Sequence, residues 1–229
     1  MPPKNSAKTY IENGYYHIYN RGVEKRLIYQ DQQDYGVYLS YLKTYLLPVD
    51  RDSLLHQLSL PITSAYEKDQ IRKQLRLNNF ADEIKLLAYS LMPNHFHLLV
   101  KQKSSNAIDS FMNSLSTRYT LFFNRKYKRV GSLHQDVYKA VMVESDEQLT
   151  HLTRYVHKQA LPLQGDPLQA QPSSYPEYCG MRKTEWVHPE EVLAYFSKKN
   201  PQLSYQEFMG LSQIPEIIGS TALDEEPEY

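Results

Sequence analysis

The chain of 229 residues contains 26 basic and 26 acidic residues and a single cysteine, Cys179. One cysteine excludes an internal disulfide framework and a cysteine-based zinc site, and no apolar run approaches the ~20 residues that span a bilayer. Residues 1–8 are polar, so we expect no signal peptide and a cytoplasmic protein.

Charge is unevenly distributed along the chain. Residues 1–160 hold 22 Lys and Arg against 15 Asp and Glu, whereas residues 161–229 hold 4 against 11. A basic body suggests a polyanionic partner, although an excess this small is also common on a solvated surface. The 20 tyrosines are consistent with stacking on unpaired bases and equally with half-buried packing.

Apolar periodicity predicts alternating strands and helices along the first 160 residues. Strands place apolar side chains at every second position, and amphipathic helices place them at spacings of three and four. Ser145 is the expected N-cap of the last helix, with Gln148 at the capping-box position. In chain order, we expect a strand over 14–20, a helix over 31–47, a hairpin of strands over 85–91 and 95–101, a helix over 106–127, a strand over 137–143 and a helix over 146–159.

This order of elements predicts an α+β fold in which helices cover a ferredoxin-like antiparallel sheet. The polar segment 48–81, with a helix over 66–77, is interpreted as an insertion into that fold. We expect a main domain over 1–163 and a C-terminal extension over 164–229. In chain order, the extension should contain helices around 189–197 and 204–211 and a disordered acidic end at 224–229.

Two histidines, His95 and His97, lie on the second strand of the predicted hairpin. Side chains alternate along a strand, so both histidines face one side while Phe96 faces the other. Two imidazoles on one face form a ready pair of metal ligands. Half-exposed histidines would give the same pattern, and the spacing alone does not separate the two interpretations.

The last predicted helix places Tyr155 and Gln159 on one face, with His151 one turn earlier. Surface side chains of an amphipathic helix explain this arrangement as well. A second interpretation is chemical. A tyrosine hydroxyl can attack a phosphodiester, and a divalent cation on the histidines can neutralise the phosphate. The Gln159 amide oxygen suits Mg²⁺ or Mn²⁺ beside imidazoles.

These segments resemble the single-tyrosine HUH transposase family, and most closely its branch of REP-associated tyrosine transposases. The segment 95–97 resembles the family's His-hydrophobic-His motif, and 154–159 resembles the segment that carries the nucleophile. Other segments with the family's pattern, in the family's order, are 16–22, 123–127, 131–135, 138–139 and 173–186.

The resemblance implies a HUH fold and a metal-dependent endonuclease and strand transferase that cuts single-stranded DNA near hairpins. By motif, Tyr155 would be the nucleophile, leaving a 5′-phosphotyrosine. His95, His97 and Gln159 would bind Mg²⁺ or Mn²⁺; many relatives have Asn where Gln159 stands, which also supplies an amide oxygen. His157 is an alternative ligand, but it lies two residues from Tyr155 and should face away.

The resemblance also implies hairpin-forming single-stranded DNA as the partner, no membrane, a nucleoid-associated location, and either a monomer or a homodimer that exchanges the nucleophile helix. Two other functions remain open: a DNA-binding regulator that has lost cleavage, and a metallohydrolase that activates water while Tyr155 is structural. Basic and polar residues expected to contact DNA, each of which could instead be solvated, are Asn20, Arg21, Arg118, Arg125, Lys126, Arg129 and Lys139.

Overall fold

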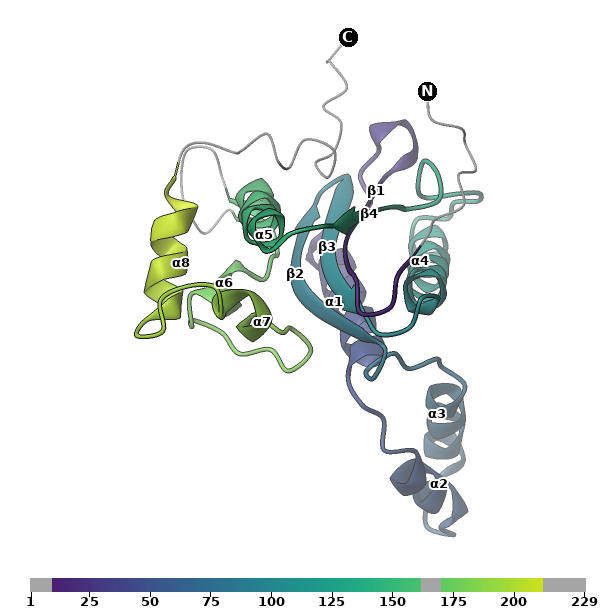
Figure 1. Ribbon diagram of the computed structural model, residues 1–229. Helices are drawn as coiled ribbons and strands as arrows, with labels where there is room; N and C mark the ends of the chain where they lie inside the picture. Colours follow the sequence, from purple (N-terminus) through teal and green to yellow (C-terminus); the bar gives the residue numbers. More distant parts are fainter. Residues whose placement is uncertain (1–9, 162–169, 212–229) are drawn as a thin grey trace.

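The computed structural model describes residues 10–161 and 170–211 (Figure 1). The acidic end at 224–229, expected to be disordered, lies outside these residues. The centre of the fold is a four-stranded sheet with strand order β2-β3-β1-β4, in which every neighbouring pair is antiparallel. Its strands are β1 (Tyr15–Arg21), β2 (Ile84–Met92), β3 (His95–Gln102) and β4 (Lys139–Val143). This order confirms the predicted α+β fold with a ferredoxin-like sheet.

Two helices, α1 (Gln32–Leu46) and α4 (Ala107–Lys126), cover one face of the sheet (Figure 1). Helix α1 begins where the Asp31 side chain accepts a hydrogen bond from the Asp34 amide, which is an N-cap. The core beneath both helices contains the side chains at even positions of β3, among them Phe96 and Leu98. The face opposite the histidines is therefore fully packed.

Helix α5 (Asp146–Ala160) covers the other face, and its Leu152 and Val156 pack with Leu99 of β3. The predicted N-cap is confirmed, because the Ser145 side chain accepts a hydrogen bond from the Gln148 amide. The predicted capping box is wrong by one residue. The Gln148 side chain accepts from the Glu144 amide instead of the Ser145 amide.

The insertion forms a two-helix arm, α2 (Arg51–Ser59) and α3 (Ala65–Leu75), which stands away from the sheet (Figure 1). Helix α3 was expected and helix α2 was not. Among the residues of the arm's two helices, only Ile71 is buried. The two ends of the arm lie together, since the Asn79 side chain donates to the Leu47 carbonyl at 2.6 Å.

The C-terminal segment packs α6 (Tyr175–Tyr178), α7 (Glu190–Leu193) and α8 (Pro201–Met209) beside α5 (Figure 1). The helix predicted around 189–197 is only four residues long, and the one predicted at 204–211 begins earlier. The reason is that Asn200 caps α8, with Pro201 in the first turn. Helix α6 and the 3₁₀ helix η1 (Val23–Lys25) were not expected.

The same segment covers β2, which is an edge strand of the sheet. The Leu91 amide donates to the Pro172 carbonyl at 2.9 Å, and the His188 amide donates to the Leu86 carbonyl at 2.8 Å. The edge that an exposed strand would leave open to other chains is thereby paired. No helix in the described ranges is both long and apolar enough to cross a membrane.

Candidate functional site

His95 and His97 lie on the face of the sheet that α5 covers. Their ring centroids are 5.0 Å apart and the rings are nearly perpendicular, at 89°. Phe96 between them is fully buried on the opposite face. The strand alternation expected from the sequence therefore holds, and the two imidazoles form a pair rather than two separate surface side chains.

Each of these histidines has one nitrogen engaged and one without a partner. His97 Nδ1 lies 2.9 Å from Nε2 of His17, and His95 Nδ1 lies 2.6 Å from Oδ1 of Asn94. The Nε2 atoms of His95 and His97 are both buried and form no hydrogen bond with the described residues. An amide oxygen only accepts, so His95 carries its proton on Nδ1 and its lone pair on Nε2. Buried, unpartnered imidazole nitrogens fit the binding of a metal ion.

Both histidines are neutral near pH 7. Burial lowers the pKa of His95 to about 4, and the positive charge of Arg21 contributes. Burial also holds the pKa of His97 well below its usual value, with smaller contributions from His17, His95 and Arg21. Metal binding requires the neutral imidazole, so these side chains do not need to lose a proton to act as ligands.

Tyr155 is brought directly to the histidine pair. Its ring meets the His97 ring edge-on, with 5.5 Å between centroids and 86° between planes, and it meets the His17 ring at 6.2 Å. The side chain is only 9% exposed. Residues distant in sequence, on β1, β3 and α5, thus surround one small site. The tyrosine lies there because the apolar stripe of α5 packs on the sheet.

Gln159 follows Tyr155 by one helical turn, which is about 6 Å along the axis. It is half-buried. Among the described residues, no group of three or more His, Cys, Asp and Glu side chains could hold a metal ion. A cation at His95 and His97 would therefore draw its remaining ligands from an amide oxygen, phosphate oxygens and water.

His157 does not belong to the site, as expected from its position on the helix. Both of its nitrogens are engaged: Nδ1 with the Tyr205 hydroxyl at 2.7 Å and Nε2 with the Ser174 hydroxyl at 2.8 Å. Burial lowers its pKa to about 3. His157 therefore joins α5 to the C-terminal segment as a neutral, buried group.

Two of the residues expected to contact DNA lie on the histidine face. Arg21 pairs across the sheet with His95, and Lys139 pairs with Tyr19, which in turn pairs with His97. Arg21 is half-buried, and its Nε atom is buried without a hydrogen-bond partner in the part of the chain that the structure describes. Lys139 is exposed and lies 5.7 Å from the centroid of the Tyr19 ring. Two positive side chains therefore flank the histidine pair.

The other expected DNA contacts lie elsewhere. The Asn20 side chain points to the opposite face and donates to the Asp136 carbonyl. Lys126 forms ion pairs with Asp31 and Asp34. Arg118, Arg125 and Arg129, on α4 and the loop after it, complete this group: Arg118 stacks on Tyr41 at 4.0 Å, Arg125 is exposed, and Arg129 donates to Asn124. Their contact with DNA remains a prediction.

His17 is the site residue to which the sequence assigned no role. It is fully buried on β1 and contacts both His97 and Tyr155. The alternation of Tyr15, His17 and Tyr19 places these side chains on one face. The sequence does not reveal that β1 pairs with β3. Only this pairing shows that the face carrying His17 is also the face carrying His95 and His97.

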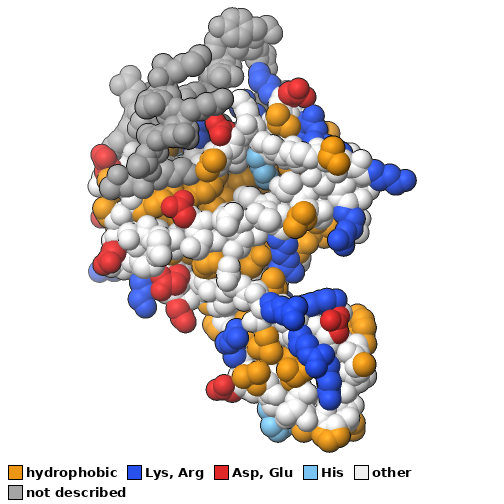
Figure 2. Space-filling view, turned by 90° about the vertical axis from the view of Figure 1, so that its right-hand side faces the viewer, with side chains coloured by type: hydrophobic (Ala, Val, Ile, Leu, Met, Phe, Trp, Pro, Cys, Tyr) orange, Lys and Arg blue, Asp and Glu red, His pale blue; other side chains and the backbone are white. Residues whose placement is uncertain are grey.

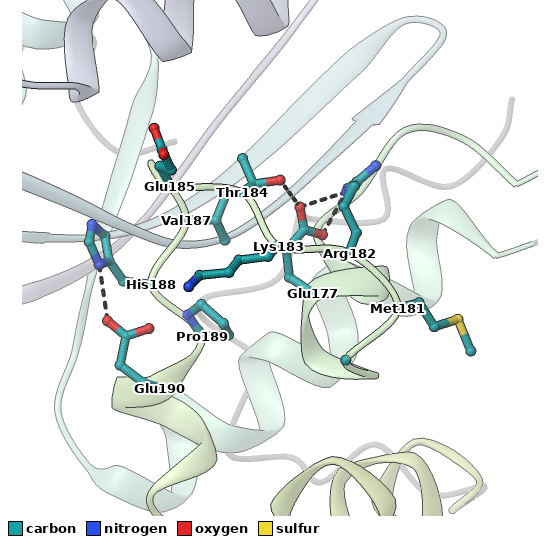
Figure 3. A pocket seen from close by; sticks show the side chains of 11 residues that line it. Glu177, Met181, Arg182, Lys183, Thr184, Glu185, Val187, His188, Pro189 and Glu190 are labelled. Atoms are coloured by element: carbon teal, nitrogen blue, oxygen red, sulfur yellow. Dashed lines mark hydrogen bonds and ion pairs between the residues drawn. The ribbon is translucent and has the colours of Figure 1, made fainter.

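A separate pocket of about 530 Å³ lies in the C-terminal segment and contains none of these residues. In Figure 3, Arg182 and Thr184 both point to the carboxylate of Glu177, and His188 points to Glu190. Glu177 is 5% exposed. Its charge is satisfied by these neighbours, which makes this cluster a structural support for the segment beside β2.

Residues 62–159 match the family model described as "Transposase IS200 like", and this range includes His95, His97, Tyr155 and Gln159. The matched range is less than half of the chain. The chain is therefore similar to IS200-like transposases over the part that carries the histidine pair and Tyr155.

No curated protein matches the chain. Among solved structures, a REP-associated tyrosine transposase bound to a REP hairpin is 10% identical, with 80% of this chain and 96% of that chain covered and a TM-score of 0.45. A protein from Deinococcus radiodurans described as a transposase is 16% identical, with 68% and 97% covered and a TM-score of 0.28. The tRNA(His) guanylyltransferase of Saccharomyces cerevisiae is 9% identical, with 98% and 85% covered and a TM-score of 0.32.

Proposed function

We propose that the protein is a metal-dependent endonuclease and strand transferase for single-stranded DNA, with Tyr155 as the nucleophile. The observation that carries the proposal is the edge-on contact between the Tyr155 ring and His97, beside two imidazole nitrogens that lack partners. A structural pair of buried histidines would be expected to use these nitrogens in hydrogen bonds.

In the proposed reaction, the Tyr155 oxygen attacks the phosphorus of a DNA phosphodiester. The new O–P bond forms as the bond from phosphorus to the 3′ oxygen breaks, and the phenol proton passes through solvent to that oxygen. The products are a 5′-phosphotyrosine and a free 3′-OH. A second strand's 3′-OH can reverse the step, so the covalent link conserves the bond for rejoining.

His95, His97 and Gln159 would hold the cation, Mg²⁺ or Mn²⁺, which supplies positive charge to the attacked phosphate. The attacking tyrosine and the phosphates are positioned by other residues of the chain. Helix α5 directs the tyrosine toward the sheet, where its ring packs against those of His97 and His17. Arg21 and Lys139 are placed to contact the phosphates on either side of the histidines.

The partner would be single-stranded DNA that forms hairpins, and the site of action would be chromosomal DNA. The chain could work alone or as a homodimer that exchanges α5. Mixing Tyr155→Phe chains with His95→Ala chains tests exchange, because activity returns only if one chain's tyrosine serves the partner's histidines.

Two alternatives differ in class. A silent DNA-binding regulator would bind the same hairpins without cutting them, but the unpartnered histidine nitrogens beside Tyr155 would then have no use. A hydrolase that activates water on the histidine pair would cut DNA without a protein adduct. Whether a covalent protein–DNA adduct forms through Tyr155 separates the proposed function from both alternatives.

The test is a covalent-adduct assay with labelled single-stranded hairpins from the flanks of the protein's own gene, in Mn²⁺ or EDTA, on a denaturing gel. We expect a metal-dependent protein–DNA band that is absent in Tyr155→Phe. Cleavage that survives Tyr155→Phe without an adduct would support the hydrolase instead. Tight binding in EDTA with neither cleavage nor adduct would support the regulator.

A further inference from the structure

His17 is a buried imidazole that the proposed reaction does not use. It lies on β1 at the centre of the sheet and is 0% exposed. Its ring lies nearly parallel to that of His97 and edge to edge with it, with 5.1 Å between centroids and 15° between planes. The Tyr19 and Tyr155 rings also contact it, at 4.9 Å and 6.2 Å. The ring is therefore confined on several sides, and its orientation is fixed by packing.

We propose that His17 is a positioning residue that fixes the tautomer of His97. In this arrangement, His97 Nδ1–H donates to Nε2 of His17, and Nε2 of His97 keeps its lone pair for a cation. The inference rests on the proposed function only for the use of that lone pair; the tautomer itself follows from the hydrogen bond of 2.9 Å between the two rings.

The direction of this hydrogen bond follows from a count of protons. A neutral imidazole has one N–H and one lone pair. If His17 were the donor, the proton of His97 would sit on Nε2, which is buried and has no partner among the described residues. Buried N–H groups without acceptors are rarer in proteins than buried acceptors without donors. The arrangement with the proton on Nδ1 of His97 is therefore favoured.

His95 is held in the same way as His97, by a hydrogen-bond acceptor at its Nδ1 atom. Oδ1 of Asn94 holds Nδ1 of His95 at 2.6 Å, and an amide oxygen can only accept. His17 gives the equivalent acceptor to His97. Because its Nε2 is used in this bond, His17 acts through His97 and not as a third ligand. Two acceptors thus leave both Nε2 lone pairs available to a cation, as the outer partners of ligand histidines do in metal sites.

Two substitutions separate the hydrogen bond from the packing. His17→Phe keeps a flat ring between Tyr19 and Tyr155 but removes the acceptor. His17→Gln places an amide oxygen close to the position of Nε2 and restores an acceptor. His157→Gln is the matched control, since it alters a buried histidine on α5 whose nitrogens are engaged elsewhere.

The first measurement is the tautomer of His97 in the metal-free protein, from the ¹⁵N chemical shifts and long-range ¹H–¹⁵N couplings of the imidazole. We expect the Nδ1–H form in the wild type and in His17→Gln, and the Nε2–H form in a substantial share of His17→Phe molecules. A wild type with the proton on Nε2 would overturn the proposal without any variant, so a His17→Phe chain that fails to fold does not leave the proposal untested.

The second measurement is the dissociation constant for Mn²⁺, by calorimetry or electron paramagnetic resonance, without DNA. Loss of an outer partner typically weakens a metal site about 10- to 100-fold, which is the increase in Kd expected for His17→Phe. His17→Gln should recover most of it, and His157→Gln should match the wild type.

A folded His17→Phe with unchanged Mn²⁺ affinity and unchanged tautomer would refute the positioning role of His17. If the wild type shows the Nδ1–H tautomer but binds no Mn²⁺, the metal part of the proposed function fails while the tautomer comparison still decides the role of His17.

Discussion

Arg21 shows how a single side chain can link the sheet to the proposed chemistry. It pairs across the sheet with His95, its charge adds to the effect of burial in lowering the pKa of His95 and His97, and its Nε atom is buried without a partner among the described residues. A guanidinium next to the attacked phosphate would stabilise the charge that develops there. Removing one such donor typically costs about 10²- to 10³-fold in rate.

We therefore expect Arg21→Gln to lower the rate of adduct formation about 100-fold, measured in single turnover with a saturating hairpin. Arg72→Gln is the matched control, because Arg72 is an exposed arginine on α3, in the arm that stands away from the sheet. Its rate should stay within about twofold of the wild type. Equal losses in the two variants would show that Arg21 acts only through general charge.

The metal-binding role proposed for Gln159 rests on the chemistry of its amide oxygen rather than on a contact with the histidine pair. If its amide oxygen is a ligand, Gln159→Leu should weaken Mn²⁺ binding about 10-fold or more, while Gln159→Glu should keep or strengthen it because a carboxylate is a better ligand for a hard cation. Titration of Mn²⁺ into the three proteins distinguishes these outcomes. Equal affinities would assign the third position to water or phosphate.

Much of the site could be predicted from the sequence because its residues have short local spacings. His95 and His97 are two apart on a strand, and Tyr155 and Gln159 are four apart on a helix, so periodicity alone gives their shared faces. The role of His17 could not be predicted in this way. It depends on the register between β1 and β3, and register is fixed by long-range packing.

Helix α5 carries the proposed nucleophile, and its buried His157 makes the stability of the protein depend on pH. Burial holds the pKa of His157 at about 3, whereas the unfolded chain has a histidine pKa near 6.5. Between these two pH values, His157 therefore binds a proton in the unfolded state and stays neutral in the folded state. The stabilisation is complete above about pH 6.5 and is lost at about 1.4 kcal/mol per pH unit as the pH falls from there towards 3.

His157→Gln should be less stable than the wild type at pH 7, because it loses hydrogen bonds to Ser174 and Tyr205. That difference should shrink by about 2 kcal/mol at pH 5, since Gln has no proton to bind. Urea unfolding at both pH values gives the two free energies. The other buried histidines titrate alike in both proteins and cancel in the comparison. A difference that is independent of pH would mean that His157 binds a proton as readily in the folded protein as in the unfolded chain.

The α2–α3 arm contributes little to the core. Only Ile71 of its two helices is buried, and its ends are held together by the bond from Asn79 to Leu47. Figure 2 shows it as a lobe below the body, with several Lys and Arg side chains on the visible face. Its basic face does not by itself identify a partner.

Replacing residues 49–77 by a short Gly-Ser linker should leave the sheet and the site intact. Since about 1 kcal/mol corresponds to roughly 2–4 °C in a chain of this size, we expect a melting temperature within about 3 °C of the wild type and unchanged Mn²⁺ affinity. A loss of more than about 10 °C would show that the arm contributes to the core.

The arm also shows where helix prediction from sequence fails. Helix α2 has no buried side chain, so it lacks the periodic core contacts that reveal a helix; its visible signal is the Asp50 cap, which accepts from the Ser53 amide. By contrast, α1 and α4 were predicted to within about two residues because both bury an apolar stripe.

At the scale of the whole molecule, the sheet separates two cores. One lies under α1 and α4, and the other lies under α5 and the C-terminal segment. The second core holds Tyr155 in place, and it contains Tyr178 and Tyr205 of the C-terminal segment, both 0% exposed. The site is therefore built jointly by the main sheet and by residues beyond the predicted boundary at 163.

This arrangement predicts that the C-terminal segment is required for folding of the site. A chain ended after Leu161 would lose Tyr178 and Tyr205 from the core, each worth roughly 1.5–3 kcal/mol of burial. It would also expose the edge of β2 and leave His157 without partners. We expect it to melt at lower temperature, to bind a dye for exposed apolar surface, and to form no adduct.

A chain ended after Leu211 keeps every described contact, and it is the matched control. If instead the shorter chain melted and bound Mn²⁺ like the wild type, the division into a self-sufficient domain over 1–163 and an extension over 164–229 would be correct, and the packing of that extension on α5 would be incidental to the site.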